Sequence, residues 1–385
     1  MRRRISIGML VALAATVALA QQPPSPGQGR PRPGQGQEPE WPAPSIREYK
    51  PRSTLVVPQH PTPRAKFPAI DIHSHHFNPP TPEQFDRVVA AMDANNLRVL
   101  VNLSGGSGER LARWLEVLRT TKHKDRMVVF ANVDFGGGVG PGFGRNAAAQ
   151  LEADIRAGAL GLKIYKDLGL RLKRTDGTRL KVDDPELDPI WETCARLGVP
   201  VLIHTAEPQE FFEPIDFTNE RWLELALFRN RRYQDPWFPR FEELIAERDR
   251  MFARHPKTTF IAAHMAYHAN DLGRLGRLLD KLPNLFTEVA AVLAEFGRQP
   301  RTAHDFFVKY QDRVLFGKDS FQPDEYPYYW RTFETADEYF DYYRDYHAFW
   351  KLYGLDLPDV ALRKLYYANA LKVVKGLPAK GFAGS

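Results

Sequence analysis

Most of the chain alternates between short apolar runs and longer stretches in which apolar residues recur every three or four positions. The runs have the length of buried β-strands, and the longer stretches have the spacing of amphipathic helices. One helix is expected to begin with the capping-box sequence Thr81–Gln84 and to carry an apolar stripe of Phe85, Val88, Val89 and Met92. The predicted strands lie near residues 67–75, 97–103, 127–133, 160–165, 199–204, 258–264, 284–289 and 313–319.

Strands that alternate with helices favour a parallel sheet covered by those helices. Eight such units between residues 67 and 376 predict an α/β protein with a (β/α)₈ TIM barrel. The loops after strands 5 and 8 are expected to be long, over residues 205–239 and 320–335. A hairpin is predicted over residues 170–182. A doubly wound open sheet is the alternative fold, although no GxGxxG sequence follows the first strand.

The first 66 residues differ in composition from the rest of the chain. Three arginines, a short apolar stretch and the small residues Ala18-Leu19-Ala20 predict a signal peptide over residues 1–20. An uncleaved membrane anchor is the alternative. Residues 21–66 are rich in Pro, Gly and Gln and predict a disordered linker, and residues 377–385 form a tail. We therefore expect an exported protein, periplasmic or secreted, without stable membrane insertion after cleavage.

The charge and the cysteine content exclude some classes of function. The formal net charge is +6, and three of these charges belong to Arg2, Arg3 and Arg4. The rest of the chain has no long basic block, so we do not expect a nucleic-acid partner. Cys194 is the only cysteine, which leaves no intramolecular disulfide and makes a buried apolar role for this thiol the expected one.

Unusual polar residues stand where the predicted strands end. In a (β/α)₈ barrel, the carboxyl ends of the strands carry the active-site groups. His73 and His75 alternate along the first strand, so both imidazoles point to the same face and can hold one metal ion. A single strand-end histidine is usually structural, but several together are hard to explain separately. The other strand-end residues are Lys163, His204, His264 and Asp319.

These strand ends resemble the amidohydrolase superfamily. The matching segments are Asp71–His75, Leu202–His204, Ala262–His264, Leu315–Asp319 and Tyr367–Ala370. The closer similarity is to the amidohydrolase-related branch, which contains metal-dependent hydrolases and enzymes like aminocarboxymuconate-semialdehyde decarboxylase. The resemblance covers about residues 67–376 and implies a TIM barrel with a divalent metal centre.

The resemblance also implies a role for each matching residue. His73, His75, His204 and Asp319 would bind the first ion, and Asp319 would also carry a proton. His264 would either bind a second ion or act as a catalytic acid and base. Lys163 would be carboxylated and bridge two ions in the binuclear subtype, or contact an anion if it is unmodified. Imidazole and carboxylate ligands make zinc the expected metal, with one or two ions per chain.

The expected activity is hydrolysis of a small-molecule amide, lactone or ester by metal-activated water. One alternative is a metal-dependent non-oxidative decarboxylase, a carboxy-lyase of the same family. Another is a barrel that binds a metal or a ligand without catalysis. The long loop after strand 5 offers Arg231, Arg232 and Trp237 as substrate-binding residues. The aromatic residues of the long loops would equally pack the loops or form the surface of a homo-oligomer.

Overall fold

The computed structural model describes residues 42, 44–347 and 349–382. It divides the chain into a unit ending at Arg52 and a compact unit from Ser53 to Ser385. The predicted signal peptide and the linker up to residue 41 lie outside the described residues. Within the described part, the longest apolar helices still fall short of what is needed to cross a membrane.

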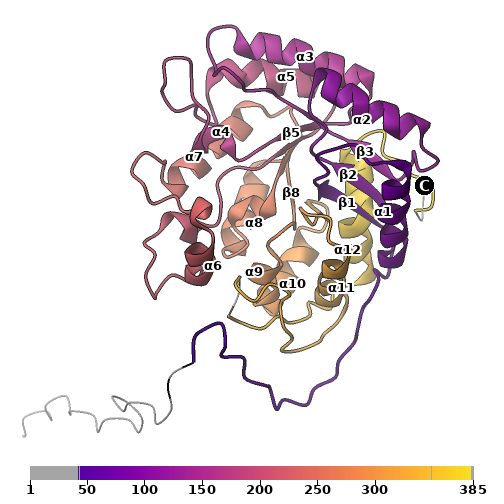
Figure 1. Cartoon of the computed structure of the whole chain (residues 1–385), viewed down its shortest axis with the longest axis vertical. Coiled ribbons are helices and arrows are strands. Elements are labelled where there is room, and N and C mark those ends of the chain that lie inside the picture. The colour runs from indigo at the N-terminus through magenta and orange to yellow at the C-terminus, as the bar shows by residue number, and fades with distance from the viewer. Residues whose placement is uncertain (1–41, 43, 348, 383–385) are drawn as a thin grey trace, which may run out of the picture. The chain divides into compact units, whose positions relative to one another are not determined.

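Parallel strands at the centre of the larger unit confirm the predicted (β/α)₈ barrel (Figure 1). They pair in the order β1-β2-β3 and then β4-β5-β6-β7-β8-β9, and every pair is parallel. The strands are β1 (Ala69–Ser74), β2 (Leu97–Asn102), β3 (Met127–Val129), β4 (Ala131–Asn132), β5 (Leu162–Ile164), β6 (Val201–Ile203), β7 (Phe260–Ala262), β8 (Leu285–Glu288) and β9 (Val314–Leu315).

One predicted strand, residues 127–133, is split into β3 and β4 at Phe130. A Cβ atom on Gly161 would lie 2.6 Å from the Phe130 ring, so the aromatic side chain occupies space that only glycine leaves open. The backbone of Val129 accepts from Leu160, and Ala131 donates to Gly161. The two halves therefore continue one another and together form the third of the eight strands of the barrel.

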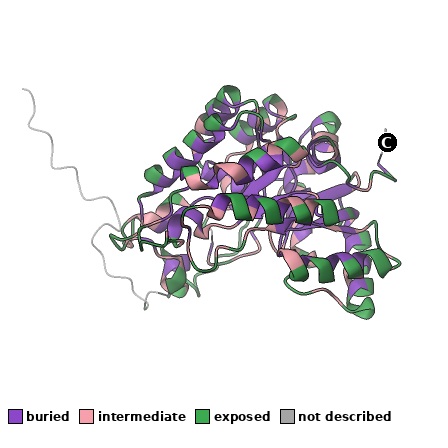
Figure 2. Ribbon diagram, turned by 90° about the horizontal axis from the view of Figure 1, so that it is seen from above, coloured by how far each residue is buried: buried purple, intermediate pink, exposed green. Residues whose placement is uncertain are grey.

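Helices surround the strands and turn their exposed faces outward (Figure 2). In α1 the predicted capping box between Thr81 and Gln84 is present, and Phe85, Val89 and Met92 are buried. The helices are α1 (Pro82–Asn95), α2 (Gly108–Thr120), α3 (Phe143–Ala157), α4 (Asp167–Leu170), α5 (Asp188–Leu197), α6 (Trp222–Leu227), α7 (Phe241–Arg254), α8 (Leu272–Lys281), α9 (Leu293–Gly297), α10 (Pro300–Lys309), α11 (Tyr326–Glu334), α12 (Asp359–Arg363) and α13 (Asn369–Val373).

The seam between the last strand and the first is closed by a few backbone contacts. Ile72 N donates to Phe316 O at 3.0 Å, and Asp319 N donates to His73 O at 2.6 Å. A π-helical turn between α12 and α13 exposes the carbonyl of Leu365, which accepts from Phe316 N at 2.9 Å. Asn369, in the Tyr367–Ala370 segment noted above, donates from Nδ2 to Val314 O at 2.7 Å. The C-terminal helix therefore fixes the strand that leads to Asp319.

The predicted hairpin forms, with an antiparallel bridge between Lys173 and Arg179.

The last residues of the predicted linker also have ordered contacts with the barrel. His60 donates its backbone N–H to Asp337 Oδ2 at 2.8 Å, and its Nδ1 lies 2.5 Å from Asp337 Oδ1. Ala65 is buried in the core. Residues 60–65 therefore lie against the barrel.

Asp337 holds this segment in place, since its carboxylate also accepts from Arg331 Nε at 2.7 Å. We expect Asp337→Asn to lower the free energy of unfolding by about 2 kcal/mol, because a buried charged acceptor with several donors is lost. Urea denaturation measures the change. Asp341→Asn is the control, because Asp341 is 79% exposed and pairs with Lys351. Equal losses in the two variants would show that the Asp337 contacts do not stabilise the fold.

Candidate metal centre

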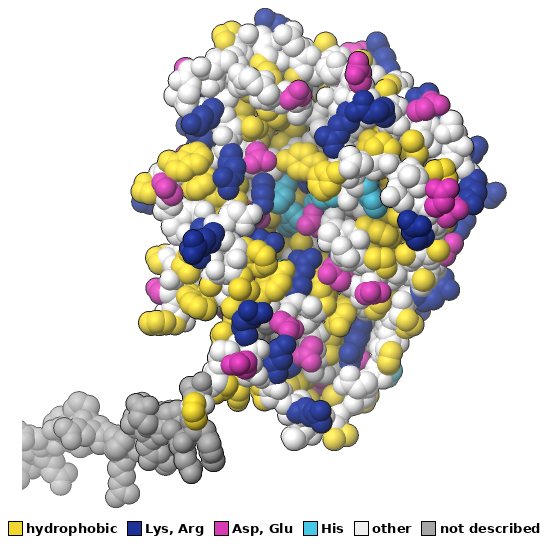
Figure 3. Space-filling model, viewed as in Figure 1, with side chains coloured by type: hydrophobic (Ala, Val, Ile, Leu, Met, Phe, Trp, Pro, Cys, Tyr) yellow, Lys and Arg dark blue, Asp and Glu magenta, His cyan; other side chains and the backbone are white. Residues whose placement is uncertain are grey.

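The barrel brings all six strand-end residues predicted from the sequence to one place. The rings of His75, His73, His264 and His204 form a continuous series, with centroid distances of 5.2, 5.0 and 4.4 Å. Figure 3 shows histidine side chains at the floor of a hollow in the surface. The residues come from β1 (His73 and, just beyond it, His75), from β5 (Lys163) and from the segments after β6 (His204), β7 (His264) and β9 (Asp319).

His73, His75 and Asp319 form the tightest group. The two Nε2 atoms lie 3.2 Å apart, and Asp319 Oδ1 lies 3.3 Å from the first and 3.5 Å from the second. Lys163 Nζ lies 3.2 Å from His73 Nε2. Which of these atoms carries a hydrogen follows from the partners on the other side of each ring.

Glu288 determines the tautomer of His73. His73 Nδ1 lies 2.9 Å from Glu288 Oε1. Burial raises the pKa of Glu288, but the charge and the hydrogen bond of His73 outweigh burial and lower it to about 2. An ionised carboxylate only accepts, so His73 Nδ1–H donates, and in the neutral ring the lone pair is then on Nε2.

A chain of hydroxyl groups determines the tautomer of His75. Tyr165 donates its O–H to Leu103 O at 3.1 Å, and its oxygen lies 2.9 Å from Ser104 Oγ. Ser104 Oγ lies 2.8 Å from His75 Nδ1. Every hydrogen in this chain is used when His75 Nδ1–H donates to Ser104 and Ser104 donates to Tyr165. The Nε2 atom of His75 then carries a free lone pair, which faces His73 and Asp319. Burial lowers the pKa of His75 to about 2, which keeps this ring neutral.

His204 is oriented by Tyr267 and Glu207. Tyr267 donates its O–H to Glu207 Oε2 at 2.9 Å. Burial raises the pKa of Glu207, but His204 and Lys166 outweigh it and lower that pKa, so the carboxylate only accepts. The Tyr267 oxygen, 2.7 Å from His204 Nε2, must therefore accept from that nitrogen. Ala206 O, at 3.1 Å, is a second acceptor for the same N–H. His204 Nδ1 keeps its lone pair.

His264 presents a lone pair to His204. Its Nδ1 lies 2.8 Å from Ala290 O, a carbonyl that can only accept. The Nε2 atom of His264 is therefore without a hydrogen, and it lies 3.2 Å from His204 Nδ1. Burial lowers the pKa values of both rings, that of His204 to about 3. Two lone pairs thus face each other at hydrogen-bond distance without a proton between them.

The residues present fit a divalent cation, because nitrogen and oxygen atoms with free lone pairs converge at the end of the barrel strands. Negative charge also favours a cation there, since Glu288 and Asp319 outweigh burial and Lys163 and raise the pKa of His73. Imidazole nitrogen and carboxylate oxygen are suitable ligands for zinc and related ions. The converging atoms are His73 Nε2, His75 Nε2 and Asp319 Oδ1, and beside them His204 Nδ1 and His264 Nε2 face each other.

Glu288 supports the centre and does not act as a ligand. His73, His264 and Glu288 also place one ligand atom each within 4.8 Å of one another. However, Glu288 Oε1 already accepts from His73 Nδ1 and from His264 N at 2.7 Å, and Oε2 accepts from Ala290 N at 2.5 Å. Both oxygens of the carboxylate therefore already accept hydrogen bonds. The described residues therefore favour one ion at His73, His75 and Asp319, with His204 and His264 beside it.

Asp319 is positioned by an unusual backbone. Its φ is +81°, in the left-handed region, and its side chain is 38% exposed. Position 317, two residues before Asp319, requires glycine, because a Cβ there would lie 2.8 Å from both Glu288 Oε2 and His73 Cβ. Lys318 turns away from the centre and pairs with Glu325. Histidines around Asp319 outweigh burial and hold its pKa well below the usual range, so the carboxylate is ionised.

Lys163 is buried, and burial lowers its pKa to about 8. Its carboxylation stays a prediction.

A left-handed turn after β7 is the other unusual feature: φ lies between 51° and 59° from His264 to Tyr267. Non-glycine residues adopt this conformation at a cost of about 1–2 kcal/mol each. The turn carries the Tyr267 hydroxyl to His204, and such strain is concentrated at functional sites.

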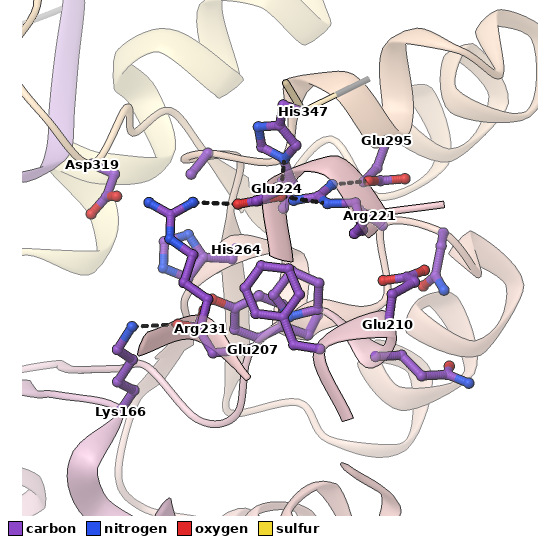
Figure 4. Close-up of a pocket in the computed structure, with 18 of the residues that line it drawn as sticks. Lys166, Glu207, Glu210, Arg221, Glu224, Arg231, His264, Glu295, Asp319 and His347 are labelled. Carbon is purple, nitrogen blue, oxygen red and sulfur yellow. Dashed lines mark hydrogen bonds and ion pairs between the residues drawn. The ribbon is translucent and has the colours of Figure 1, made fainter. Parts of the chain in front are cut away.

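A cavity of about 170 Å³ opens beside this centre and is lined by His204, His264 and Asp319. Figure 4 shows further charged residues of its wall, among them Arg231 and Lys166, which belong to the loops after β6 and β5. Arg232 and Trp237 do not line it.

Arg232 and Trp237 instead make contacts within the loop. Arg232 donates to the carbonyl of Leu225 at 2.8 Å, and Trp237 stacks on Phe238 with ring centroids 4.2 Å apart. Of the three substrate-binding residues predicted from the loop, the structure therefore brings only Arg231 to the cavity.

A family model described as Amidohydrolase matches residues 70–376, most of the chain. The chain belongs to the amidohydrolase family. It is thus a metal-dependent enzyme, as the converging ligand atoms also indicate. A search of curated proteins finds no match.

Solved structures show the same fold at low sequence identity. A candidate amidohydrolase from Staphylococcus aureus is 15% identical, with 80% of this chain and 99% of that chain covered and a TM-score of 0.51. The 2,6-dihydroxybenzoate decarboxylase from Rhizobium is 18% identical over 80% and 98% of the two chains, with a TM-score of 0.48. The 4-oxalomesaconate hydratase from Rhodopseudomonas palustris is 14% identical over 80% and 95%, also at 0.48. At these identities the likeness shows the barrel fold alone.

Some residues of this amidohydrolase site escape sequence analysis. Ser104 directly follows the second strand, so the strand-end rule that selects the histidines would also select it. Glu288 lies at the end of a strand, but the groups that donate to it become visible only in the fold. Tyr267 gives no signal, because nothing in its sequence neighbourhood predicts a left-handed turn.

We expect Glu288→Gln to weaken zinc binding by about 10- to 100-fold, because the ionised acceptor that fixes the tautomer of His73 becomes a neutral amide. Competition with a chromophoric chelator measures the affinity. Glu242→Gln is the matched control, since Glu242 is 63% exposed and pairs with Arg274. A zinc affinity within twofold of the unmodified chain would refute the role assigned to Glu288.

Tyr267→Phe is expected to weaken zinc binding by about tenfold, because the His204 Nε2–H loses the oxygen that orients the ring. Tyr310→Phe removes a hydroxyl–carboxylate bond of the same length, 2.9 Å to Asp280, on helices away from the centre. Its zinc affinity should not change. If both variants bind zinc equally well, the hydroxyl of Tyr267 does not position His204.

Proposed function

We propose that this chain is an exported, zinc-dependent hydrolase that acts on a small-molecule amide, lactone or ester. The observation that carries the proposal is the convergence of imidazole and carboxylate lone pairs at His73, His75 and Asp319 beside a cavity. A bound divalent ion lowers the pKa of a coordinated water and polarises a carbonyl group. His204 and His264 add two further nitrogen atoms to the set.

Asp319 is the proton carrier in this proposal. Its ionised carboxylate is partly exposed and lines the cavity, so it can take a proton from water and return it to the leaving group. His264 is the second candidate for proton transfer. Its ring is held through Nδ1 by Ala290 O, and Nε2 can take a proton and then donate to the substrate oxygen.

A carboxy-lyase is the second candidate function. It is favoured by the hydrogen bonds that both oxygens of Glu288 accept from protein donors. Because Glu288 is then not a metal ligand, the remaining ligands suit a single ion. In that reaction the ion and its ligands would bind the carboxylate side of the substrate, with His264 as acid and base. A barrel that binds ligand without turnover is the non-catalytic alternative, and it predicts no product with any substrate.

Export is part of the proposal and rests on the N-terminal sequence. The basic start, apolar stretch and Ala18-Leu19-Ala20 site support cleavage after residue 20. Mass spectrometry of the protein recovered from the periplasm or the medium would give the mature N-terminus. Gel filtration with light scattering would show whether a homo-oligomer forms.

We expect removal of zinc by a chelator to abolish hydrolysis, and added zinc to restore it. We expect Asp319→Asn to lower kcat by about 100- to 10,000-fold, because the proton carrier is lost. A panel of esters, lactones and amides in ¹⁸O-labelled water provides the assay. Asp324→Asn, at an exposed position on the same loop, is the control.

Two results would contradict the proposal. Release of CO₂ without incorporation of solvent oxygen would establish the carboxy-lyase. Nearly full hydrolysis by Asp319→Asn would exclude Asp319 as the proton carrier.

A further inference from the structure

A second group of charged side chains lines the cavity away from the ligand atoms. Glu224 stands at its centre (Figure 4), where it pairs with Arg231 and accepts from Arg221 Nε at 2.8 Å. His347 Nε2 lies 4.0 Å from the same carboxylate. Arg344 lines the cavity as well. These residues come from the loop after β6 and from the segment after α11, two insertions that the barrel itself does not need.

Arginines are numerous in this group, and they share their carboxylate partners. Arg221 and Arg231 both pair with Glu224. Glu295, 2.8 Å from Arg221, also neutralises Arg298 at 2.9 Å. Glu325, 3.6 Å from Arg344, is already the partner of Lys318.

Glu210 also lines the cavity, beyond Arg221 in Figure 4. Among the three arginines, Arg344 has the longest carboxylate contact, 3.6 Å to Glu325, so it is the one with room for a further anionic partner.

Two of these side chains have unused hydrogen-bonding capacity. His347 Nδ1 is buried, and no described residue is a hydrogen-bond partner for it. Burial and the three arginines hold the pKa of His347 well below its usual range, so the ring is neutral and carries one N–H. The guanidinium of Arg344 is 21% exposed and meets Glu325 only at 3.6 Å, outside hydrogen-bond distance. A buried polar atom left unpaired costs about 1–3 kcal/mol, so such atoms usually meet a ligand or water.

We propose that Arg231, Arg344 and His347 form a subsite for a carboxylate group of the substrate that is not the group undergoing reaction. Planar guanidinium groups match a carboxylate in geometry and charge. An anion beside His347 Nδ1 places the ring hydrogen on that atom. The proposal rests on the proposed function, because the subsite shares its cavity with His264 and Asp319. A volume of about 170 Å³ accommodates a single ring, since cavities of about 150 Å³ hold benzene.

Two probes of the same shape test the subsite. Terephthalate carries a second carboxylate where 4-carbamoylbenzoate carries a neutral amide. Calorimetry of the full chain, with and without zinc, gives both dissociation constants. We expect terephthalate to bind at least about tenfold more tightly, as for one added charge-assisted pair.

Arg344→Gln and His347→Phe should each reduce that preference to about threefold or less. Arg229→Gln should keep it, because Arg229 lies on the same loop as Arg231 but is exposed and does not line the cavity.

Equal affinities of the two probes for the unmodified chain would overturn the subsite. A preference that survives in both Arg344→Gln and His347→Phe would overturn its assignment to these residues. Failure of the proposed function would look different: no zinc would bind and no substrate would be hydrolysed. A preference for terephthalate in such a protein would still support the subsite.

Discussion

The buried carboxylate of Glu288 is the interaction on which the rest of the centre depends. It accepts from the His73 ring and from the backbone N–H groups of His264 and Ala290, so it connects the ends of β1, β7 and β8. One ionised group thereby fixes the tautomer of His73 and the start of the turn that carries His264. It also requires glycine at position 317, where a Cβ would meet it at 2.8 Å.

The backbone around this carboxylate is held in costly conformations. Asp319 and the turn from His264 to Tyr267 lie in the left-handed region. Glu288 holds the start of the turn through His264 N. Beside Asp319, Asp71 accepts from His73 N at 2.9 Å, Lys318 N at 3.1 Å and Tyr326 O–H at 2.6 Å. Burial raises the pKa of Asp71 to about 6. Strain of this kind persists where the surrounding structure over-determines it, and here it places ligand atoms.

Much of the fold follows from periodicity, because strand spacing and helical spacing differ along this chain. The strand ends then locate His73, His75, His204, His264 and Asp319 without a structure. Tautomers do not follow, since they depend on contacts such as His73 with Glu288, 215 positions apart. The loops are the least predictable part. Arg231 and Arg232 are adjacent in sequence, yet only Arg231 reaches the cavity, because Arg232 binds the carbonyl of Leu225.

Metal content is the most direct test of the central claim that the converging lone pairs form a metal centre. Elemental mass spectrometry would be applied to the chain purified without chelators or a histidine tag and dialysed against zinc. We expect about one zinc ion per chain, retained at His73, His75 and Asp319. Two ions would contradict the single-ion arrangement and assign Lys163 the bridging role. No retained ion would contradict the claim itself, because the lone pairs of His73, His75 and Asp319 would then converge without a cation.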